Sequence, residues 1–127
     1  MDENGAMQSP TIGELAKALS ADQALIKAPK KTREANIGTY KYQYADLGDV
    51  IEAVGDVLSK NGLARHQPIA QRDGHSVLVT KILHTSGEWI SSEYPLKAYD
   101  KPQEQGSAIT YARRYSLSSM LGIAAED

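Results

Sequence analysis

The stretch QGSAITYARRYSLSSMLG, residues 105–122, says more about this chain than any other part of it. It predicts one helix with an unusual surface, because two adjacent arginines, Arg113 and Arg114, stand between two tyrosines. Tyr111 and Tyr115 are spaced so that both lie on one side of such a helix. Guanidinium groups bind phosphates and tyrosine rings stack on bases. The stretch therefore suits single-stranded nucleic acid, while an oligomer-interface helix with ion-paired arginines is the alternative explanation.

The helical wheel of this stretch adds a second indication. Its apolar residues cover a broad arc, and Arg113 falls inside that arc while Arg114 lies toward the polar edge. An arginine on an apolar arc must be paired, or must face something other than the protein core. An anionic ligand or a neighbouring subunit would meet that need. The residues of the arc are Ile109, Ala112, Leu117, Met120 and Ile123.

Length and composition predict one globular domain. The chain has 127 residues, of which 41% are hydrophobic and 24% are charged, and these are ordinary values. We expect residues 1–9 to be disordered and residues 10–127 to form the domain. The absence of cysteine excludes disulfides and thiolate zinc sites. Without a signal peptide or an apolar run of bilayer length, a cytoplasmic protein is expected.

The charge balance is less informative than its distribution. A net charge of −2 argues mildly against nucleic acid, because phosphate-binding proteins usually carry a basic surplus. However, Lys27, Lys30, Lys31 and Arg33 form a cluster that contains no acidic residue. This cluster is either a basic strip for DNA or a solvated loop.

The N-terminal half is expected to contain a helix, a linker and a short strand. Ser9-Pro10-Thr11 opens the helix, with a capping box formed by Thr11 and Glu14, and Pro29 ends it. Residues 29–38 are expected to be a basic linker. Residues 40–44 alternate aromatic and polar side chains, which is typical of a strand. The three tyrosines of that strand form either a core face or a row that stacks on bases.

The middle of the chain predicts a helix followed by an antiparallel meander, and hence an α+β fold. Asp46 caps a helix with an apolar stripe, and Gly62 ends it in a left-handed conformation. Three strands follow, at about 63–71, 75–85 and 88–96. Asp73-Gly74 is a strong signal for a two-residue hairpin turn, and Ser86-Gly87 is expected to make the second turn. We expect this three-stranded sheet to pack against the helices.

Tight turns would divide the residues of the sheet between two faces. The expected outer face is mixed and contains Arg65, Thr80, Ile82, and Trp89 beside His84. Such a face suggests contact with another subunit or a ligand, and the expected subunit contacts are Trp89, His84 and Arg65. Lys81 falls on the apolar face, and this register does not explain it. The expected core face collects Ala64, Ala70, Val77, Val79, Leu83, Ile90, Tyr94 and Leu96.

No motif supports an enzyme. The chain has no phosphate-binding loop of the nucleotide triphosphatase type and no nucleophile elbow. The three histidines, His66, His75 and His84, are not spaced like metal ligands. We therefore expect no catalytic residue, cofactor or metal. A small enzyme that acts on an anionic substrate through Arg113 and Arg114 is an alternative with no further support.

Three segments together resemble the ERF (essential recombination function) family of phage single-strand annealing proteins. They are YQYADL at residues 42–47, with Val50-Ile51 and Gly62-Leu63 after it, HTSGEW at 84–89, and QGSAITYARRY at 105–115, which continues through Leu121-Gly122-Ile123-Ala124. The third segment is long and distinctive. The resemblance covers about residues 40–127 and leaves the first forty residues uncovered.

This resemblance implies a β-β-β-α core and a recombination function in the cytoplasm of a bacterial host. Members of the family bind single-stranded DNA without sequence preference, anneal complementary strands without ATP, and assemble into rings or filaments. They act beside a phage exonuclease and the host single-strand binding protein. Similar proteins continue beyond Ala124 into an acidic C-terminal tail, so we expect this chain to hold the DNA-binding core without that tail.

Annealing requires a grip on the sugar-phosphate backbone that leaves the pairing edges of the bases free. The expected stacking residues are Tyr42, Tyr111 and Tyr115. The alternative is an oligomeric interaction module of a phage or prophage that uses Trp89 for protein contacts and does not bind DNA. The expected cationic contacts are, in order, Arg113 and Arg114, then Lys97 and Lys101, then Lys30, Lys31, Arg33 and Lys41.

Overall fold

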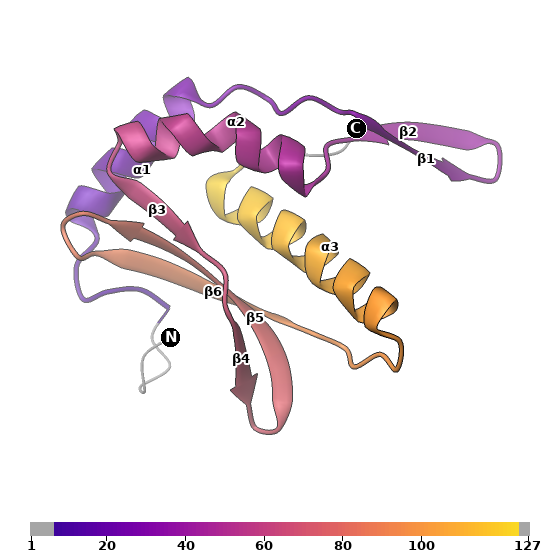
Figure 1. Ribbon diagram of the computed structural model, residues 1–127. Helices are drawn as coiled ribbons and strands as arrows, with labels where there is room; N and C mark the ends of the chain where they lie inside the picture. Colours follow the sequence, from indigo (N-terminus) through magenta and orange to yellow (C-terminus); the bar gives the residue numbers. More distant parts are fainter. Residues whose placement is uncertain (1–6, 125–127) are drawn as a thin grey trace.

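A computed structural model describes residues 7–124 and confirms the α+β class (Figure 1). This part of the chain forms three helices and six strands, and the strands make two antiparallel sheets. The N-terminal segment 1–6 and residues 125–127 lie outside the described residues. The elements are α1 (Gly13–Leu25), β1 (Arg33–Ile37), β2 (Tyr40–Tyr44), α2 (Leu47–Lys60), β3 (Leu63–His66), β4 (Ile69–Arg72), β5 (His75–His84), β6 (Trp89–Pro95) and α3 (Pro102–Leu121).

The larger sheet is built around β5. Strand β6 pairs along one edge of β5, and β3 and β4 pair with two parts of the other edge. The expected single strand 63–71 is thus divided at Gln67-Pro68, where proline supplies no N–H to the ladder. Residues 7–9, expected to be disordered, run along β6, and the Ser91 amide donates to the Met7 carbonyl at 2.8 Å.

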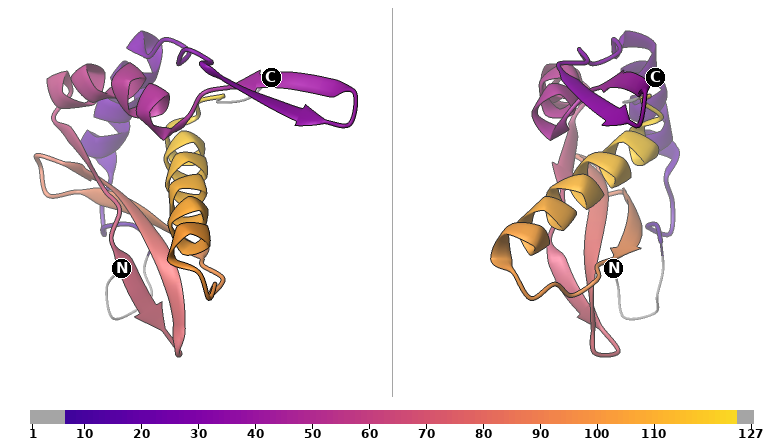
Figure 2. Two further views of the ribbon diagram at one scale, coloured as in Figure 1. Left: turned by 45° about the vertical axis from the view of Figure 1, so that its right-hand side comes forward. Right: turned by 90° about the vertical axis from the view of Figure 1, so that its right-hand side faces the viewer.

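One face of this sheet carries the hydrophobic core. Leu78, Thr80 and Ile82 of β5 are fully buried, and α3 lies across β5 and β6 on this face (Figure 2). α2 packs against β3 and α3, and α1 packs against β5 and α2. The core cluster consists of Leu15, Ala45, Val50, Val54, Leu58, Leu63, Ile82, Leu117 and Leu121.

The expected assignment of sheet faces is wrong, because the loop between β5 and β6 is longer than a two-residue turn. Leu83 pairs with Trp89, and the His84 amide donates to the Glu88 carbonyl at 2.9 Å. Pairing shifts by one residue relative to the expected turn, so the side chains of one strand exchange faces relative to the other. Thr80 and Ile82 therefore lie on the core face.

Two further expectations for the sheet change with this register. Trp89 lies on the face opposite His84, and Lys81 lies over the Trp89 ring with its Nζ 4.4 Å from the centroid. The position of Lys81 is thereby explained as a cation–π contact. Val77 and Val79 are also on the Trp89 face, although they are buried.

The capping of α1 also differs from the expectation. The helix begins at Gly13, ends at Leu25, and has no side-chain cap from Thr11. Instead, Glu88 of the β5–β6 loop accepts hydrogen bonds from the Leu15 amide at 2.8 Å and the Thr11 hydroxyl at 2.7 Å. These two donors hold the pKa of Glu88 below its usual value. A carboxylate distant in sequence thus caps the helix.

Local signals elsewhere are confirmed. Asp46 caps α2 and forms a capping box with Asp49. Gly62 has φ +72°. Asp73-Gly74 makes the two-residue turn between β4 and β5, with φ values of 51° and 81°. These features depend only on neighbouring residues, which is why the sequence predicts them.

The segment expected to be a linker is partly a strand. β1 and β2 pair in antiparallel register and form a two-stranded ribbon that projects from the rest of the molecule (Figures 1 and 2). In this register Ala35 is opposite Tyr42 and Ile37 is opposite Tyr40, so both share the face of the tyrosines. The ribbon is therefore amphipathic.

The Glu88 cap predicts a pH dependence of stability. Because the folded-state pKa is lowered, this carboxylate stabilises the fold above its unfolded pKa, near 4.5, and the stabilisation is lost as pH falls through the folded pKa. Glu88→Gln should lower the melting temperature at pH 7, and the difference from wild type should shrink toward pH 3. Circular dichroism melts measure both, with Glu52→Gln on the exposed side of α2 as control. A difference that stays constant over this range would contradict the account.

Candidate nucleic-acid interface

The arginine-tyrosine stretch forms α3, as expected. One side of this helix is buried against the core, and the opposite side faces solvent. Ala112, Ser116, Leu117, Ser118 and Leu121 are buried, and the helix ends at Gly122 with φ +71°. Tyr111 and Tyr115 remain 47% and 53% exposed. Their rings are stacked, with centroids 6.0 Å apart and an interplanar angle of 17°.

Arg114 joins α3 to the projecting ribbon. Its Nη1 donates to the Ala45 carbonyl at 3.3 Å. Its guanidinium carbon is 5.0 Å from the Tyr44 ring centroid and 5.3 Å from the Tyr111 ring centroid. The same cation therefore lies close to one ring of the ribbon and one ring of α3.

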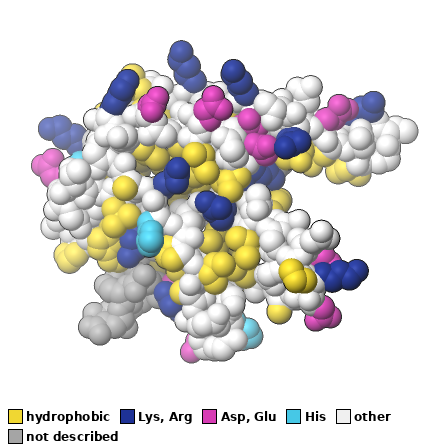
Figure 3. Space-filling view, in the orientation of Figure 1, with side chains coloured by type: hydrophobic (Ala, Val, Ile, Leu, Met, Phe, Trp, Pro, Cys, Tyr) yellow, Lys and Arg dark blue, Asp and Glu magenta, His cyan; other side chains and the backbone are white. Residues whose placement is uncertain are grey.

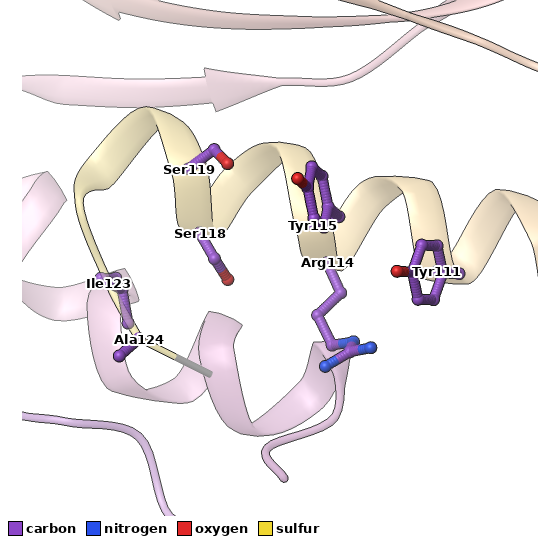
Figure 4. A pocket seen from close by; sticks show the side chains of 7 residues that line it. All are labelled: Tyr111, Arg114, Tyr115, Ser118, Ser119, Ile123 and Ala124. Carbon is purple, nitrogen blue, oxygen red and sulfur yellow. The ribbon is translucent and has the colours of Figure 1, made fainter. Parts of the chain in front are cut away.

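A pocket of about 290 Å³ lies beside these residues on α3 (Figure 4). Ser118 contributes to its wall, and the Ser118 hydroxyl is buried without a hydrogen-bond partner in residues 7–124. A buried hydroxyl of this kind is costly unless something binds it. The pocket is lined by Tyr111, Arg114, Tyr115, Ser118, Ser119, Ile123 and Ala124.

Arg113 lies on another side of the helix, toward the division between β3 and β4. Its carbonyl accepts from Gln67 Nε2 at 3.1 Å, and the same amide donates to the Thr80 hydroxyl at 3.0 Å. The Arg113 side chain is half-buried. Arg113 therefore lies at the margin of the core, next to the hydrogen bonds by which Gln67 joins the sheet to α3.

The tyrosines of β2 extend the aromatic surface away from α3. Tyr42 stacks on Tyr40 with centroids 5.9 Å apart and lies 6.1 Å from Tyr44. On the other side, the Tyr94 ring of β6 meets Tyr115 edge-on at 5.8 Å. Tyr40, Tyr44 and Tyr94 were not among the predicted site residues. The alternation of tyrosine and polar residues over 40–44 already indicates that Tyr40 and Tyr44 share a face with Tyr42. The position of Tyr94 beside Tyr115 can be known only from the register of the sheet.

The other predicted cations are dispersed over the surface. Lys97 has its Nζ 5.6 Å from the Tyr99 ring, and Lys101 precedes α3, so both lie near the start of that helix and away from Arg114. Lys30 borders a separate groove between α1 and α2. Figure 3 shows lysines and arginines spread over this face, not gathered in one patch.

The predicted cations nearest the tyrosines take different positions. Arg33 is opposite Tyr44 on the same face of the ribbon, and it pairs with Asp46 at 3.1 Å. Lys41 lies on the other face, where its Nζ is 4.0 Å from a Glu34 carboxylate oxygen. Lys31 is half-buried just before β1. Of this group, the register places Arg33 on the face of the tyrosines.

The predicted subunit-contact residues do not form one surface. His84 Nδ1 is 2.9 Å from the Ser86 hydroxyl, on the face opposite Trp89. Arg65 is exposed on β3, opposite Ile82 in the register. The expectation that Trp89 lies beside His84 is wrong for the same reason as the sheet faces, whereas Arg65 and His84 share one face.

Comparisons with known proteins give one family match. The ERF superfamily profile matches residues 15–127. Searches of curated proteins and of solved structures return no significant match. Among residues 7–124, none of the helices combines the length and apolar character that crossing a membrane requires. The profile covers most of the chain, including α3 and the ribbon, and the chain therefore belongs to the ERF superfamily, whose members act in phage recombination and single-strand annealing.

Proposed function

We propose that this chain binds single-stranded DNA and anneals complementary strands without ATP, as a homo-oligomer. The observation that carries the proposal is the exposed, stacked pair Tyr111–Tyr115 with the Arg114 guanidinium beside it. Aromatic rings stack on any base, and this contact does not depend on sequence. Membership in the ERF superfamily supports the same function.

The chemistry of the site suits annealing. A base that stacks on tyrosine is held by its face, so its Watson–Crick edge stays available to a complementary strand. The Arg114 guanidinium lies beside those rings, where a cation suits phosphate oxygens. No covalent bond is made or broken in annealing, so the function needs no catalytic group.

The proposal includes an oligomer because a single site of this kind is expected to bind DNA weakly. The net charge is −2, so long-range attraction of the whole chain for phosphates is weak. A single protomer offers a few stacking rings and few cations in one place. Repetition of this site along one strand would raise the affinity through effective concentration. The proposed partners are therefore single-stranded DNA and further copies of the chain, with a phage exonuclease and the host single-strand binding protein as partners in the cell.

Replacing the stacked rings should weaken DNA binding without unfolding the protein. Tyr111→Ala or Tyr115→Ala should each cost about 1–3 kcal/mol of binding free energy, the usual value for one stacked base. Fluorescence anisotropy with a labelled oligothymidine measures this loss. Tyr99→Ala, which removes an exposed tyrosine outside the site, should bind like wild type. Equal losses in all three variants would contradict the proposal, and absence of wild-type binding at low salt would favour the protein-interaction module.

The salt dependence of binding tests the role of Arg113. If its guanidinium contacts one phosphate, Arg113→Gln should reduce the slope of log K against log salt by about 0.7, the value for one contact to a single strand. Lys17→Gln, an exposed cation on α1, should leave the slope unchanged. We choose Arg113 because Arg114 also bonds the Ala45 carbonyl. An unchanged slope in Arg113→Gln would show that this arginine makes no phosphate contact.

The proposed assembly predicts a large particle. Light scattering of the purified chain with a long oligothymidine should give a mass of many protomers, because each copy adds one weak site to the same strand. A protein that stays monomeric on that strand would contradict the oligomeric part of the proposal.

A further inference from the structure

The ring contacts continue beyond α3 in both directions and form one unbroken series. Arg114 lies between Tyr44 and Tyr111, so the tyrosines of the ribbon and those of the helix meet at one guanidinium. We propose that the DNA site extends along this whole series, which we call the tyrosine track. This inference rests on the proposed function and adds the path of the strand. The track comprises, in order, Tyr40, Tyr42, Tyr44, Arg114, Tyr111, Tyr115 and Tyr94.

The chemistry of the β1–β2 ribbon supports this extension. At its tip, Tyr40 is 58% and Ile37 is 65% exposed, and both lie on the tyrosine face. A ribbon of two strands is marginally stable on its own in water, and this one exposes large apolar side chains at its tip. Figure 3 shows hydrophobic side chains on the underside of the ribbon, toward the rest of the molecule. The opposite face carries Glu34, Asn36, Lys41 and Gln43.

The difference between the two faces of the ribbon identifies the side that a strand would use. The polar face holds an acidic and a basic side chain 4.0 Å apart, so it offers no surplus of positive charge. The aromatic face offers rings that stack on bases, with the Arg114 guanidinium 5.0 Å from the Tyr44 centroid, whereas Arg33 on this face is paired with Asp46. Bases therefore have partners on the aromatic face, and Arg114 supplies a cation for phosphates where the ribbon meets α3.

The spacing of the rings indicates the conformation of the bound strand. Tyrosines that contact one another directly have centroids 5.8 to 6.1 Å apart, and Arg114 separates Tyr44 from Tyr111, whereas nucleotides stacked in duplex DNA rise about 3.4 Å each along one strand. A strand that follows the track is thus extended and its bases are separated from one another. A duplex keeps its base faces covered, so the track selects unpaired DNA.

Tyr40 is the best residue for a test, because it ends the track and is distant from Arg114 along the series. Tyr40→Leu keeps an apolar side chain at the tip but removes the ring, and Tyr40→Phe keeps the ring. We expect Tyr40→Leu to bind an oligothymidine of about 16 nucleotides roughly 5- to 150-fold more weakly than wild type, as for the loss of one stacked base. Affinity should rise with oligonucleotide length in both proteins, but in Tyr40→Leu it should reach its plateau at a shorter oligonucleotide than in wild type. Tyr40→Phe should bind as tightly as wild type. Asn36→Ala, which changes a residue on the polar face of the ribbon, should also bind as tightly as wild type.

The outcomes separate this inference from the proposed function. If wild type and Tyr40→Leu bind equally at every length, the ribbon is not part of the site, although α3 still binds DNA. If Tyr40→Phe fails as Tyr40→Leu does, the phenol hydroxyl and not the ring face makes the contact, and the track is wrong. If wild type binds no oligonucleotide, the proposed function fails and the track fails with it. Circular dichroism melts of each variant show whether the fold is retained.

Discussion

The contact of Arg114 with the Ala45 carbonyl holds together the parts of the molecule that matter for its proposed function. Ala45 is fully buried and stands between β2 and α2, so an α3 side chain anchors the point where the ribbon leaves the core. Asp46, the next residue, caps α2 and pairs with Arg33 at the base of the ribbon. The Thr32 hydroxyl donates to Asp49 at 2.6 Å and lowers the pKa of that carboxyl. Capping of α2, attachment of the ribbon and placement of α3 are therefore linked.

The sequence was sufficient where structure depends on neighbouring residues. The extent of α3, the cap at Asp46, the left-handed Gly62 and the turn at Asp73-Gly74 all follow from local rules. The chemistry of Tyr111 and Arg114 was also visible, because both residue types and their spacing are contained in one helix. The family resemblance rested on the same segments, and the superfamily match covers them.

Sequence-based prediction failed where the structure depends on the exact length of a loop or on a partner that is distant along the chain. A loop one residue longer than expected moved Trp89 to the face opposite His84. Strand β1, which pairs with β2 to form the ribbon, lies in the basic segment 29–38 that was expected to be a linker. The cap of α1 comes from Glu88, which lies far from Thr11 along the chain. No local pattern contains these contacts, so only the three-dimensional arrangement shows them.

The candidate site is more aromatic and less cationic than its sequence suggested. The predicted lysines are dispersed, while one tyrosine of the ribbon, Tyr44, and one of α3, Tyr111, both contact Arg114. For a chain with a net charge of −2, the proposed binding of unpaired DNA would depend mainly on stacking.

Photo-cross-linking with an oligonucleotide that carries 5-iodouracil, followed by mass spectrometry, tests this claim most directly. The account predicts adducts on Tyr111 or Tyr115. Adducts confined to Trp89 or Tyr99 would contradict it.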